Sequence, residues 1–399
     1  MKVIEELDVI HILLRHLGYR LLHSDDLSPL RVQIYMDIPP AMEAKQTEEP
    51  KKDPSLKGVV GIQNMGNTCY CNTTLQLLRA CPEWNAFCLT QNFIEQLKNV
   101  PEENTYKRIL LAYQDILKSL WSAYKPAYVR PLGFISEVRK AVKGTVYEMF
   151  GIPIPNDSHE YLVYLLDSFH EAIKTEIPFV EKPLDSAATE DERMILRAEN
   201  GWNRFLSKNN SEVVHRFFGM MRKTIQCTKC ENKSYQWEVF NSLKIPCEGQ
   251  TFQEWIQNEV KDSEIEGYHC ENCTKLTPGN DRHLAKIYSH IWKLPHSLFV
   301  TLRRFNFDGR KNMTSCPYSG ENVGFNEFFA KESNDPSKFW VYELRGVSDH
   351  HGSHMGGHYT AQFKHPISGE WWWMDDETAM KEEKAKFSAS NYIFYFRRI

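Results

Sequence analysis

One cysteine stands where the local sequence would make its sulfur reactive. Cys69 follows a Gly-Asn-Thr turn and precedes an amphipathic stretch that predicts a helix over residues 70–79. At a helix start, unpaired backbone N–H groups and the positive end of the helix dipole favour the thiolate, the nucleophilic form of cysteine. The same amides, with the side-chain N–H of Asn64, could hold the oxyanion that forms when a carbonyl is attacked. A buried structural cysteine at a helix start is the alternative.

A histidine and an aspartate lie symmetrically about a predicted turn. The glycine-rich stretch before His358 is followed by an alternating strand pattern, a turn that begins with proline, and a second strand over residues 371–374, directly before Asp375. In an antiparallel hairpin of this length the two residues face each other, with Cβ atoms about 5 Å apart. The carboxylate would accept the Nδ1 proton and leave Nε2 to take the thiol proton. A one-residue bulge would give that role to Asp376.

Two other interpretations of His358 are open at this point. It could be a surface loop histidine, or it could join His350, His351 and His354 in a metal site. The glutamate-bearing pattern of zinc proteases does not accompany these histidines. The matching position of Asp375 therefore favours a catalytic role for His358.

Four cysteines form two C-x2-C motifs, and their spacing indicates a metal site. The two pairs are separated by 39 residues, which we expect to form a long hairpin or finger. Four thiolates suit one tetrahedral zinc ion with no open position, and hence a structural rather than a catalytic site. A redox pair is the alternative, but two matched pairs favour zinc. The predicted ligands are Cys227, Cys230, Cys270 and Cys273.

The bulk composition is that of an ordinary globular protein. The formal net charge is −4, so the concentrated basic face of a nucleic-acid-binding protein is not expected. The roughly 20 uninterrupted apolar residues of a membrane span are not found, and residues 7–22 lack the features of a signal peptide. We therefore expect an intracellular protein, in the cytoplasm, the nucleus or both, whose cysteines serve as thiols or metal ligands.

The sequence pattern divides the chain into an extension and a large domain. Residues 1–57 contain an amphipathic helix pattern over 7–22 and then a linker rich in proline and charge. We interpret this part as an N-terminal extension whose helix could bind a partner. The rest is helical over about 58–205, strand-like over about 206–290 and β-rich over about 291–399. The order of these patterns predicts an α+β fold.

Several motifs, taken in order, resemble those of the ubiquitin-specific protease family of papain-like cysteine deubiquitinases. GNTCY resembles the cysteine box of the family, and GGHYTA with WMDDE resembles its histidine box. The paired cysteines sit where the family carries a zinc ion in its fingers, and LPHSLFVTLRRF and NYIFY resemble strands of its palm. The resemblance covers residues 58–399. It implies a helical thumb over about 58–205, zinc-bearing β fingers over about 206–290 and a β-rich palm over about 291–399.

The resemblance implies a thiol-dependent deubiquitinase. Its partners would be ubiquitin, polyubiquitin and ubiquitinated proteins, cut at the isopeptide or peptide bond after the C-terminal Gly of ubiquitin. Cys69 would be the nucleophile and His358 the base. Asp375 would orient the base, and Asn64 would stand at the oxyanion position.

The resemblance also implies contacts with the substrate. Asp157, at the start of a helix predicted over 157–173, would contact the basic tail of ubiquitin, although its position also fits a helix N-cap. Gly357 belongs to a glycine-rich flap that would admit the diglycine of the tail. Tyr359 would wall that channel or pack in the core, and Asp376 is expected on the substrate side.

Two rival functions compete with the deubiquitinase. The first is a catalytically silent ubiquitin-binding scaffold of the same fold, but such proteins typically lose a triad residue and here all three are present. The second is a general papain-like protease, against which the predicted zinc site argues. We expect neither a nucleic acid nor a membrane as a partner.

Overall fold

The computed structural model describes most of the chain after the N-terminal extension. The helix predicted over 7–22 and the linker that follows it lie outside the described residues. The described residues are 57–122, 126–187, 189–276, 282–306, 308–333, 339–353 and 356–399.

The first half of the described chain is mainly helical, as the apolar spacing predicted. The predicted helix over 70–79 is confirmed as α2, and the one over 157–173 as α7. A short parallel pair, β1 (Gly61–Ile62) and β2 (Tyr128–Val129), lies beside them. The helices are α2 (Cys69–Arg79), α3 (Pro82–Cys88), α4 (Gln91–Leu97), α5 (Thr105–Leu120), α6 (Leu132–Val142), α7 (Ser158–Ile173), α8 (Glu190–Asn209) and α9 (Glu212–Phe217).

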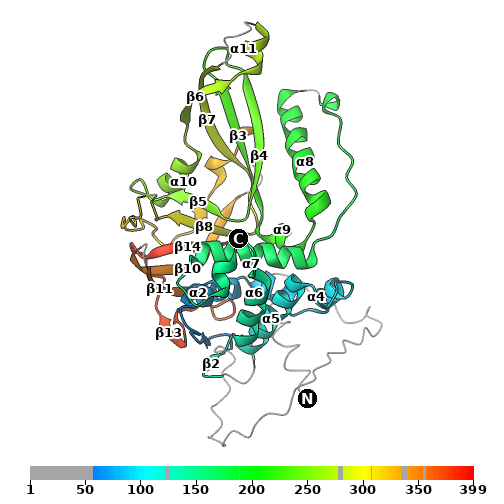
Figure 1. The fold of residues 1–399 in the computed structure, drawn as a ribbon. Coiled ribbons are helices and arrows are strands. Elements are labelled where there is room, and N and C mark those ends of the chain that lie inside the picture. Colours follow the sequence, from blue (N-terminus) through cyan, green and yellow to red (C-terminus); the bar gives the residue numbers. More distant parts are fainter. Residues whose placement is uncertain are drawn as a thin grey trace, which may run out of the picture.

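A four-stranded antiparallel sheet extends away from the helices, with strand order β4-β3-β7-β6. Helix α8 stands beside this sheet and α11 lies at its far end (Figure 1). The bounds are β3 (Gly219–Cys227), β4 (Lys233–Phe240), β6 (Ser263–His269), β7 (Arg282–Lys293), α10 (Phe252–Val260) and α11 (Glu271–Leu276).

An eight-stranded sheet forms the other half of the body. Its order is β13-β12-β11-β10-β14-β8-β5, with β9 paired to β10. Only β5 and β8 run parallel, and β14, the last strand in sequence, lies between β10 and β8. The bounds are β5 (Leu243–Pro246), β8 (Ser297–Arg303), β9 (Val323–Gly324), β10 (Val341–Ser353), β11 (Gly356–Lys364), β12 (Trp371–Asp375), β13 (Thr378–Glu382) and β14 (Asn391–Arg398).

Two apolar cores hold these layers together. In the helical core the rings of Trp84 and Tyr113 pack on Phe169, with centroids 5.7 Å and 4.8 Å away. In the second core Phe252 of α10 packs on Phe394 of β14, with ring centroids 5.5 Å apart. Each fully buried large side chain contributes about 1.5–3 kcal/mol, so both cores stabilise the fold substantially.

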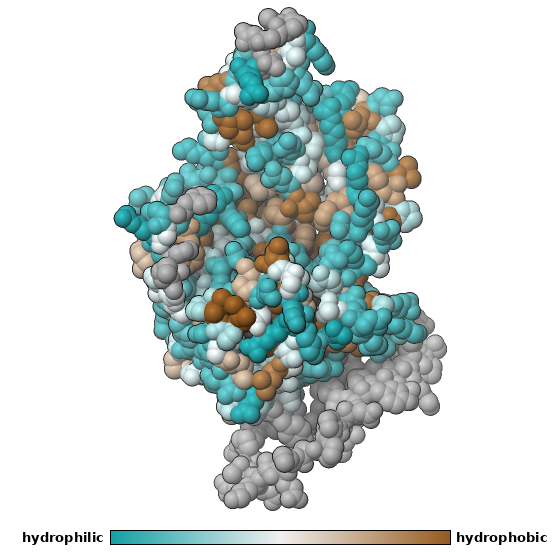
Figure 2. All heavy atoms as spheres, in the orientation of Figure 1, coloured by the Kyte–Doolittle hydropathy of each residue, from teal (hydrophilic) through white to brown (hydrophobic). Residues whose placement is uncertain are grey.

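Helix α2 is the element that joins the two halves, because it packs against both α7 and β11. Its first residue, the buried Cys69, therefore lies at the junction between the helices and the eight-stranded sheet. On the face shown in Figure 2 most side chains are hydrophilic and the apolar ones gather in separate small groups. No described helix combines the length and apolar character that crossing a bilayer requires.

Candidate active site

The sulfur of Cys69 lies at the start of α2, as predicted, but its charge state differs from the expectation. Burial raises the pKa of the thiol, whereas the backbone N–H groups of Tyr359 and Tyr70 act in the opposite direction. The nearby carboxylate of Asp376 raises the pKa further. The helix start therefore does not by itself hold a thiolate, because desolvation outweighs the amides. A base must remove the proton.

The hairpin that carries the histidine has a different register from the one predicted. Ala361 pairs with Met374 and Lys364 with Trp371, so the strands are shifted by two residues and His358 does not directly face Asp375. The reason is the turn, which the bond from the His365 N–H to the Glu370 carbonyl closes at 2.7 Å. A two-residue shift keeps each side chain on its face of the sheet, because the side-chain period of a strand is two.

The imidazole of His358 and the carboxylate of Asp375 meet across this diagonal. His358 Nε2 lies 2.5 Å from Asp375 Oδ1, and both side chains are partly exposed. The structure thus corrects the predicted atom, because Asp375 binds Nε2 and not Nδ1. In this orientation Nδ1 is the nitrogen left for other partners. The predicted pair of His358 and Asp375 is present, but the imidazole ring is flipped relative to the predicted orientation.

Asp376 lies in the tight turn after β12, in a left-handed backbone conformation with a φ of 45°. Its carboxylate accepts from Asn64 Nδ2 at 2.8 Å and from Asn72 Nδ2 at 2.7 Å. Its carbonyl accepts from the Ile62 N–H at 2.7 Å. Burial raises the pKa of the Asp376 carboxyl, although the two amides act against this. Asp376 therefore ties together three segments, and its contact with substrate stays a prediction.

The side chain of Asn64 is fixed in one orientation. Its Oδ1 accepts from the backbone N–H of Gly66 at 3.0 Å and from that of Thr68 at 3.2 Å. Its Nδ2 must then point to Asp376, to which it gives one of its two hydrogens. The second hydrogen remains for another acceptor.

Asp157 caps helix α7. Its Oδ1 accepts from the backbone N–H groups of His159 at 2.8 Å and Glu160 at 2.9 Å. Its Oδ2 accepts from the hydroxyl of Tyr392, on β14, at 2.7 Å. The predicted N-cap is confirmed, and it also links the helices to the sheet. The contact of Asp157 with a substrate stays a prediction.

A cleft of about 640 Å³ runs between α7 and the eight-stranded sheet and reaches Cys69. Four predicted residues line it, namely Cys69, Asp157, Gly357 and Tyr359, whereas Asn64, His358 and Asp375 are not among its lining residues. Sequence reasoning assigned no cleft role to Glu160, Lys244, Phe305 and Tyr392, which also line it. Glu160 could have been noticed, because it lies one helical turn after Asp157. The other three of these come from distant segments that only the tertiary fold brings together.

The wall of the cleft at Gly357 admits no side chain. A Cβ built there would lie 2.2 Å from the His351 carbonyl oxygen and 2.6 Å from His350 Nε2. Glycine is therefore required by the close approach of β10 and β11. The expected role of Gly357 in admitting the diglycine of the tail stays a prediction.

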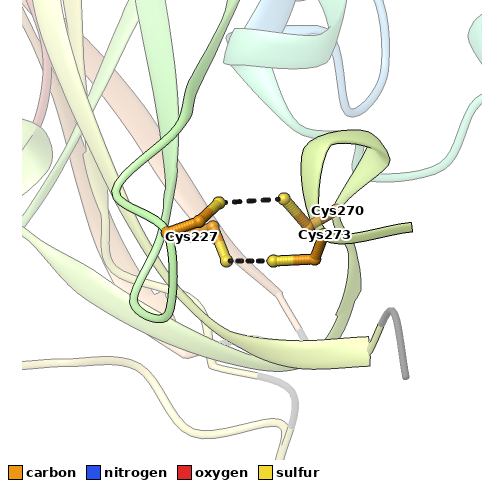
Figure 3. Close-up of side chains that lie close together, drawn as sticks. Cys227, Cys270 and Cys273 are labelled. Atoms are coloured by element: carbon orange, nitrogen blue, oxygen red, sulfur yellow. Dashed lines mark hydrogen bonds between the residues drawn. The ribbon is translucent and has the colours of Figure 1, made fainter. Parts of the chain in front are cut away.

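The four paired cysteines come together at the far end of the four-stranded sheet (Figure 3). Their sulfur atoms all lie within 4.8 Å of one another, with Cys227 3.9 Å from Cys273 and Cys230 3.5 Å from Cys270. Four thiols at these separations fit a tetrahedral zinc site.

The histidine-rich metal site that was the alternative for His358 includes His354, which lies outside the described residues. Within the described residues, the groups that could hold a metal are the four cysteines and the trio His358, Asp375 and Asp376. His350 and His351 belong to neither group.

Comparisons with known proteins agree with this geometry. The family model described as ubiquitin carboxyl-terminal hydrolase matches residues 60–396. Ubiquitin carboxyl-terminal hydrolase 2 of Rattus norvegicus is 24% identical over 356 residues, which covers 86% of this chain and 54% of that protein. Ubiquitin carboxyl-terminal hydrolase 4 of Saccharomyces cerevisiae (strain ATCC 204508 / S288c) is 27% identical over 379 residues, covering 86% and 40%. The chain spans between 36% and 58% of the length of such relatives.

Solved structures show the same fold. A chain of the SAGA DUB module bound to monoubiquitin superposes with a TM-score of 0.65 at 20% identity, covering 89% of this chain and 72% of that one. A chain of the SAGA DUB module bound to ubiquitin aldehyde gives 0.63 at 20% identity, covering 87% and 70%. The fold is thus the papain-like α+β fold that the motifs predicted. Because the family match spans most of the sequence, the chain belongs to the ubiquitin carboxyl-terminal hydrolase family.

Proposed function

We propose that this protein is an active thiol-dependent deubiquitinase that hydrolyses the isopeptide or peptide bond after the C-terminal Gly of ubiquitin. The observation that supports the proposal is that the Tyr359 N–H reaches the Cys69 sulfur while His358, one residue earlier, pairs with Asp375 through Nε2. Membership of the family and the likeness of the fold to ubiquitin-bound chains support the choice of substrate.

The chemistry follows from these positions. His358 takes the proton of Cys69 through Nδ1, while Asp375 steadies the imidazolium through Nε2. The thiolate attacks the carbonyl carbon of the last glycine, and the resulting oxyanion accepts from the second N–H of Asn64 and from the backbone N–H of Cys69. The amine leaves with the proton from His358, and a water molecule, deprotonated by the same imidazole, hydrolyses the thioester.

The tail of ubiquitin would occupy the cleft. Gly357 lines the cleft together with Cys69, and a passage beside the thiol that admits only a diglycine would exclude larger side chains. Glu160 lines the same cleft and offers a carboxylate to the basic tail, whereas both oxygens of Asp157 already accept hydrogen bonds within the protein. We therefore assign Glu160 the stronger charge contact and Asp157 the role of shaping the cleft.

We further propose that the four cysteines hold one structural zinc ion. Zinc bound by four thiolates has no open position, so it stabilises the far end of the four-stranded sheet without taking part in hydrolysis. Removing it with a strong chelator should lower the melting temperature and loosen β3, β6 and α11. Elemental analysis of the purified protein should give one zinc per chain, and a metal-free protein with an unchanged melting curve would contradict the site.

The proposed setting is intracellular, with ubiquitin, polyubiquitin and ubiquitinated proteins as partners. The described structure contains ten free cysteines and no disulfide. Thiols that act as nucleophile and metal ligands need a reducing compartment. The nucleus and the cytoplasm are both reducing compartments. Fractionation of cells that express the tagged protein tests whether the protein is found in them.

A ubiquitin probe with a C-terminal electrophile tests the central proposal. The protein should form a covalent adduct that mass spectrometry maps to Cys69. A Cys69→Ala variant should form none while still binding ubiquitin. Binding without adduct in the unmodified protein would instead establish the silent scaffold.

A further inference from the structure

A polar stripe on α2 binds the backbone that leads into Asn64. Asn72 Nδ2 donates to the Ile62 carbonyl at 3.0 Å, and Gln76 Nε2 donates to the Val60 carbonyl at 3.3 Å. Arg79 Nη1 contacts the Gly58 carbonyl and, at 3.4 Å, the Val60 carbonyl. The spacing has a simple cause. Positions 72, 76 and 79 share one face of a helix, and carbonyls 58, 60 and 62 point to one side of an extended chain.

The opposite side of this segment touches the turn that carries Asp376. A Cβ built on Gly61 would lie 2.1 Å from the Glu377 carbonyl oxygen and 2.6 Å from that of Asp376. The Ile62 N–H donates to the Asp376 carbonyl at 2.7 Å. The segment 58–62 is therefore wedged between α2 and this turn, and a shift of the segment would move the turn as well.

The use of Arg79 to hold the backbone costs free energy, because its charge is buried. Its side chain is fully buried, and among the described residues no carboxylate lies within ion-pair distance of it. Two of its nitrogens, Nε and Nη2, make no hydrogen bond there. Its guanidinium lies 3.9 Å above the ring of Phe363, on β11. A buried charge without a counter-ion costs several kcal/mol, and an apolar side chain of similar size would be cheaper. Unlike an apolar side chain, the guanidinium contacts both β11 and the segment 58–62, and it thereby fixes their positions relative to α2.

We infer that Gln76 and Arg79 are positioning residues that set the place of Asn64 and Asp376 through the segment 58–62. This inference rests on the proposed hydrolysis. Asn64 follows the segment by two residues, and its amide donates to the Asp376 carboxylate at 2.8 Å. Both ends of that bond depend on where the segment lies. Gln76 and Arg79 touch neither the cleft nor the thiol, so they act on the oxyanion donor and not on binding of the tail.

A matched pair of substitutions tests this. Gln76→Met removes one amide donor at nearly constant volume. Gln114→Met is the control, because Gln114 is equally buried and donates to the Cys88 carbonyl at 2.7 Å, away from the segment. Gln76→Met should lower kcat on a fluorogenic ubiquitin substrate roughly tenfold, as expected for a sub-ångström misplacement, with KM within about twofold. Gln114→Met should keep the kcat of the unmodified protein.

Two further readouts separate positioning from general loosening. Alkylation of Cys69 by iodoacetamide forms no oxyanion, so its rate should be the same in Gln76→Met as in the unmodified protein. Arg79→Lys keeps the charge but loses the planar set of N–H donors of the guanidinium. The kcat of this variant should fall at least as far as that of Gln76→Met. Hydrogen exchange at the Ile62 amide should be faster in Gln76→Met than in Gln114→Met.

The outcomes are distinct. An unchanged kcat in Gln76→Met, or an equal loss in Gln114→Met, would overturn the inference. If the unmodified protein fails to turn over any ubiquitin substrate, the proposed function fails, and the exchange rate of the Ile62 amide still decides whether Gln76 holds the segment.

Discussion

Asn64 and His358 each keep one group available after their internal contacts are counted. Asn64 has a second amide hydrogen, and His358 has Nδ1, because Asp375 takes Nε2. Residue types and spacing were enough to predict that the side chains of His358 and Asp375 meet. They were not enough to predict which ring nitrogen faces the carboxylate, because ring orientation depends on the positions of groups from other segments.

The thiol of Cys69 supplies a prediction at this scale. Burial raises its pKa above the ordinary value near 8.5, so below that pH the thiolate is a minor form whose fraction grows with each rise in pH. The rate of carboxymethylation by iodoacetamide should keep increasing between pH 7 and pH 9, roughly tenfold per pH unit. Mass spectrometry of the modified peptide, with Cys69→Ala as the blank, measures it. A rate that is already level at pH 6 would mean that a thiolate–imidazolium pair exists at rest.

At the scale of elements, the sequence predicted which helices and strands form better than it predicted the register of paired strands. Helix α7 appears almost where its apolar spacing placed it, and Asp157 caps it. The hairpin of β11 and β12 formed, but its register is two residues away from the prediction. The prediction centred the hairpin on residues 366–367, whereas the bond between His365 and Glu370 places its centre one residue later. Turn closure is decided by backbone contacts that residue types specify only weakly.

The close approach of β10 and β11 gives a prediction for Gly357. Gly357→Ala should force the two strands apart, because the new Cβ would meet the His351 carbonyl oxygen. We expect kcat/KM on a ubiquitin substrate to fall at least tenfold, since a shift of about 1 Å beside the reacting groups costs up to a hundredfold.

Gly133→Ala is the control for this substitution. A Cβ there meets nothing within 4 Å, and the residue lies in α6. Its activity should be unchanged and its stability equal or up to about 1 kcal/mol higher. Equal activity in both variants would contradict the requirement for glycine at 357.

At the scale of the whole molecule, the sequence indicated an α+β fold with a thiol site and a four-cysteine site, and in the structure the four cysteines come together and His358 pairs with Asp375. It did not indicate the cleft residues Lys244, Phe305 and Tyr392. These residues come from three strands or loops far apart in sequence, and no local pattern marks a side chain whose neighbours are all distant. Long-range packing alone places them.

Buried neutral histidines predict how the whole fold responds to acid. Burial lowers the pKa of His365 to about 4 and that of His159 to about 3, well below the value near 6.5 in an unfolded chain. Below pH 6.5 the unfolded chain binds more protons than the folded one, so stability falls as the pH falls. Each histidine should cost about 2 kcal/mol between pH 6.5 and pH 5.

His365→Gln isolates one of these contributions. The amide can still donate to the Lys57 carbonyl, which His365 Nε2 contacts at 2.6 Å, but it does not titrate. In urea denaturation, the stability difference between the unmodified protein and the variant should change by about 2 kcal/mol from pH 7 to pH 5. Loss of a metal ion would affect both proteins equally and so cancels in this difference. A stability difference that does not change with pH would show that His365 is not held neutral in the folded protein.

The central place of β14 has a consequence for synthesis on the ribosome. The strand is translated after every other strand of its sheet, yet β10 and β8 both bond to it. Until residues 391–398 emerge from the exit tunnel, the nascent chain must carry β10 and β8 as two open edges, which attract other chains. Tyr392, which closes the cleft wall at Asp157, arrives with the same strand. The sheet and this part of the cleft wall are therefore complete only after residues 391–398 have emerged, and chaperones that shield exposed strand edges should bind the nascent chain before that point and release it afterwards.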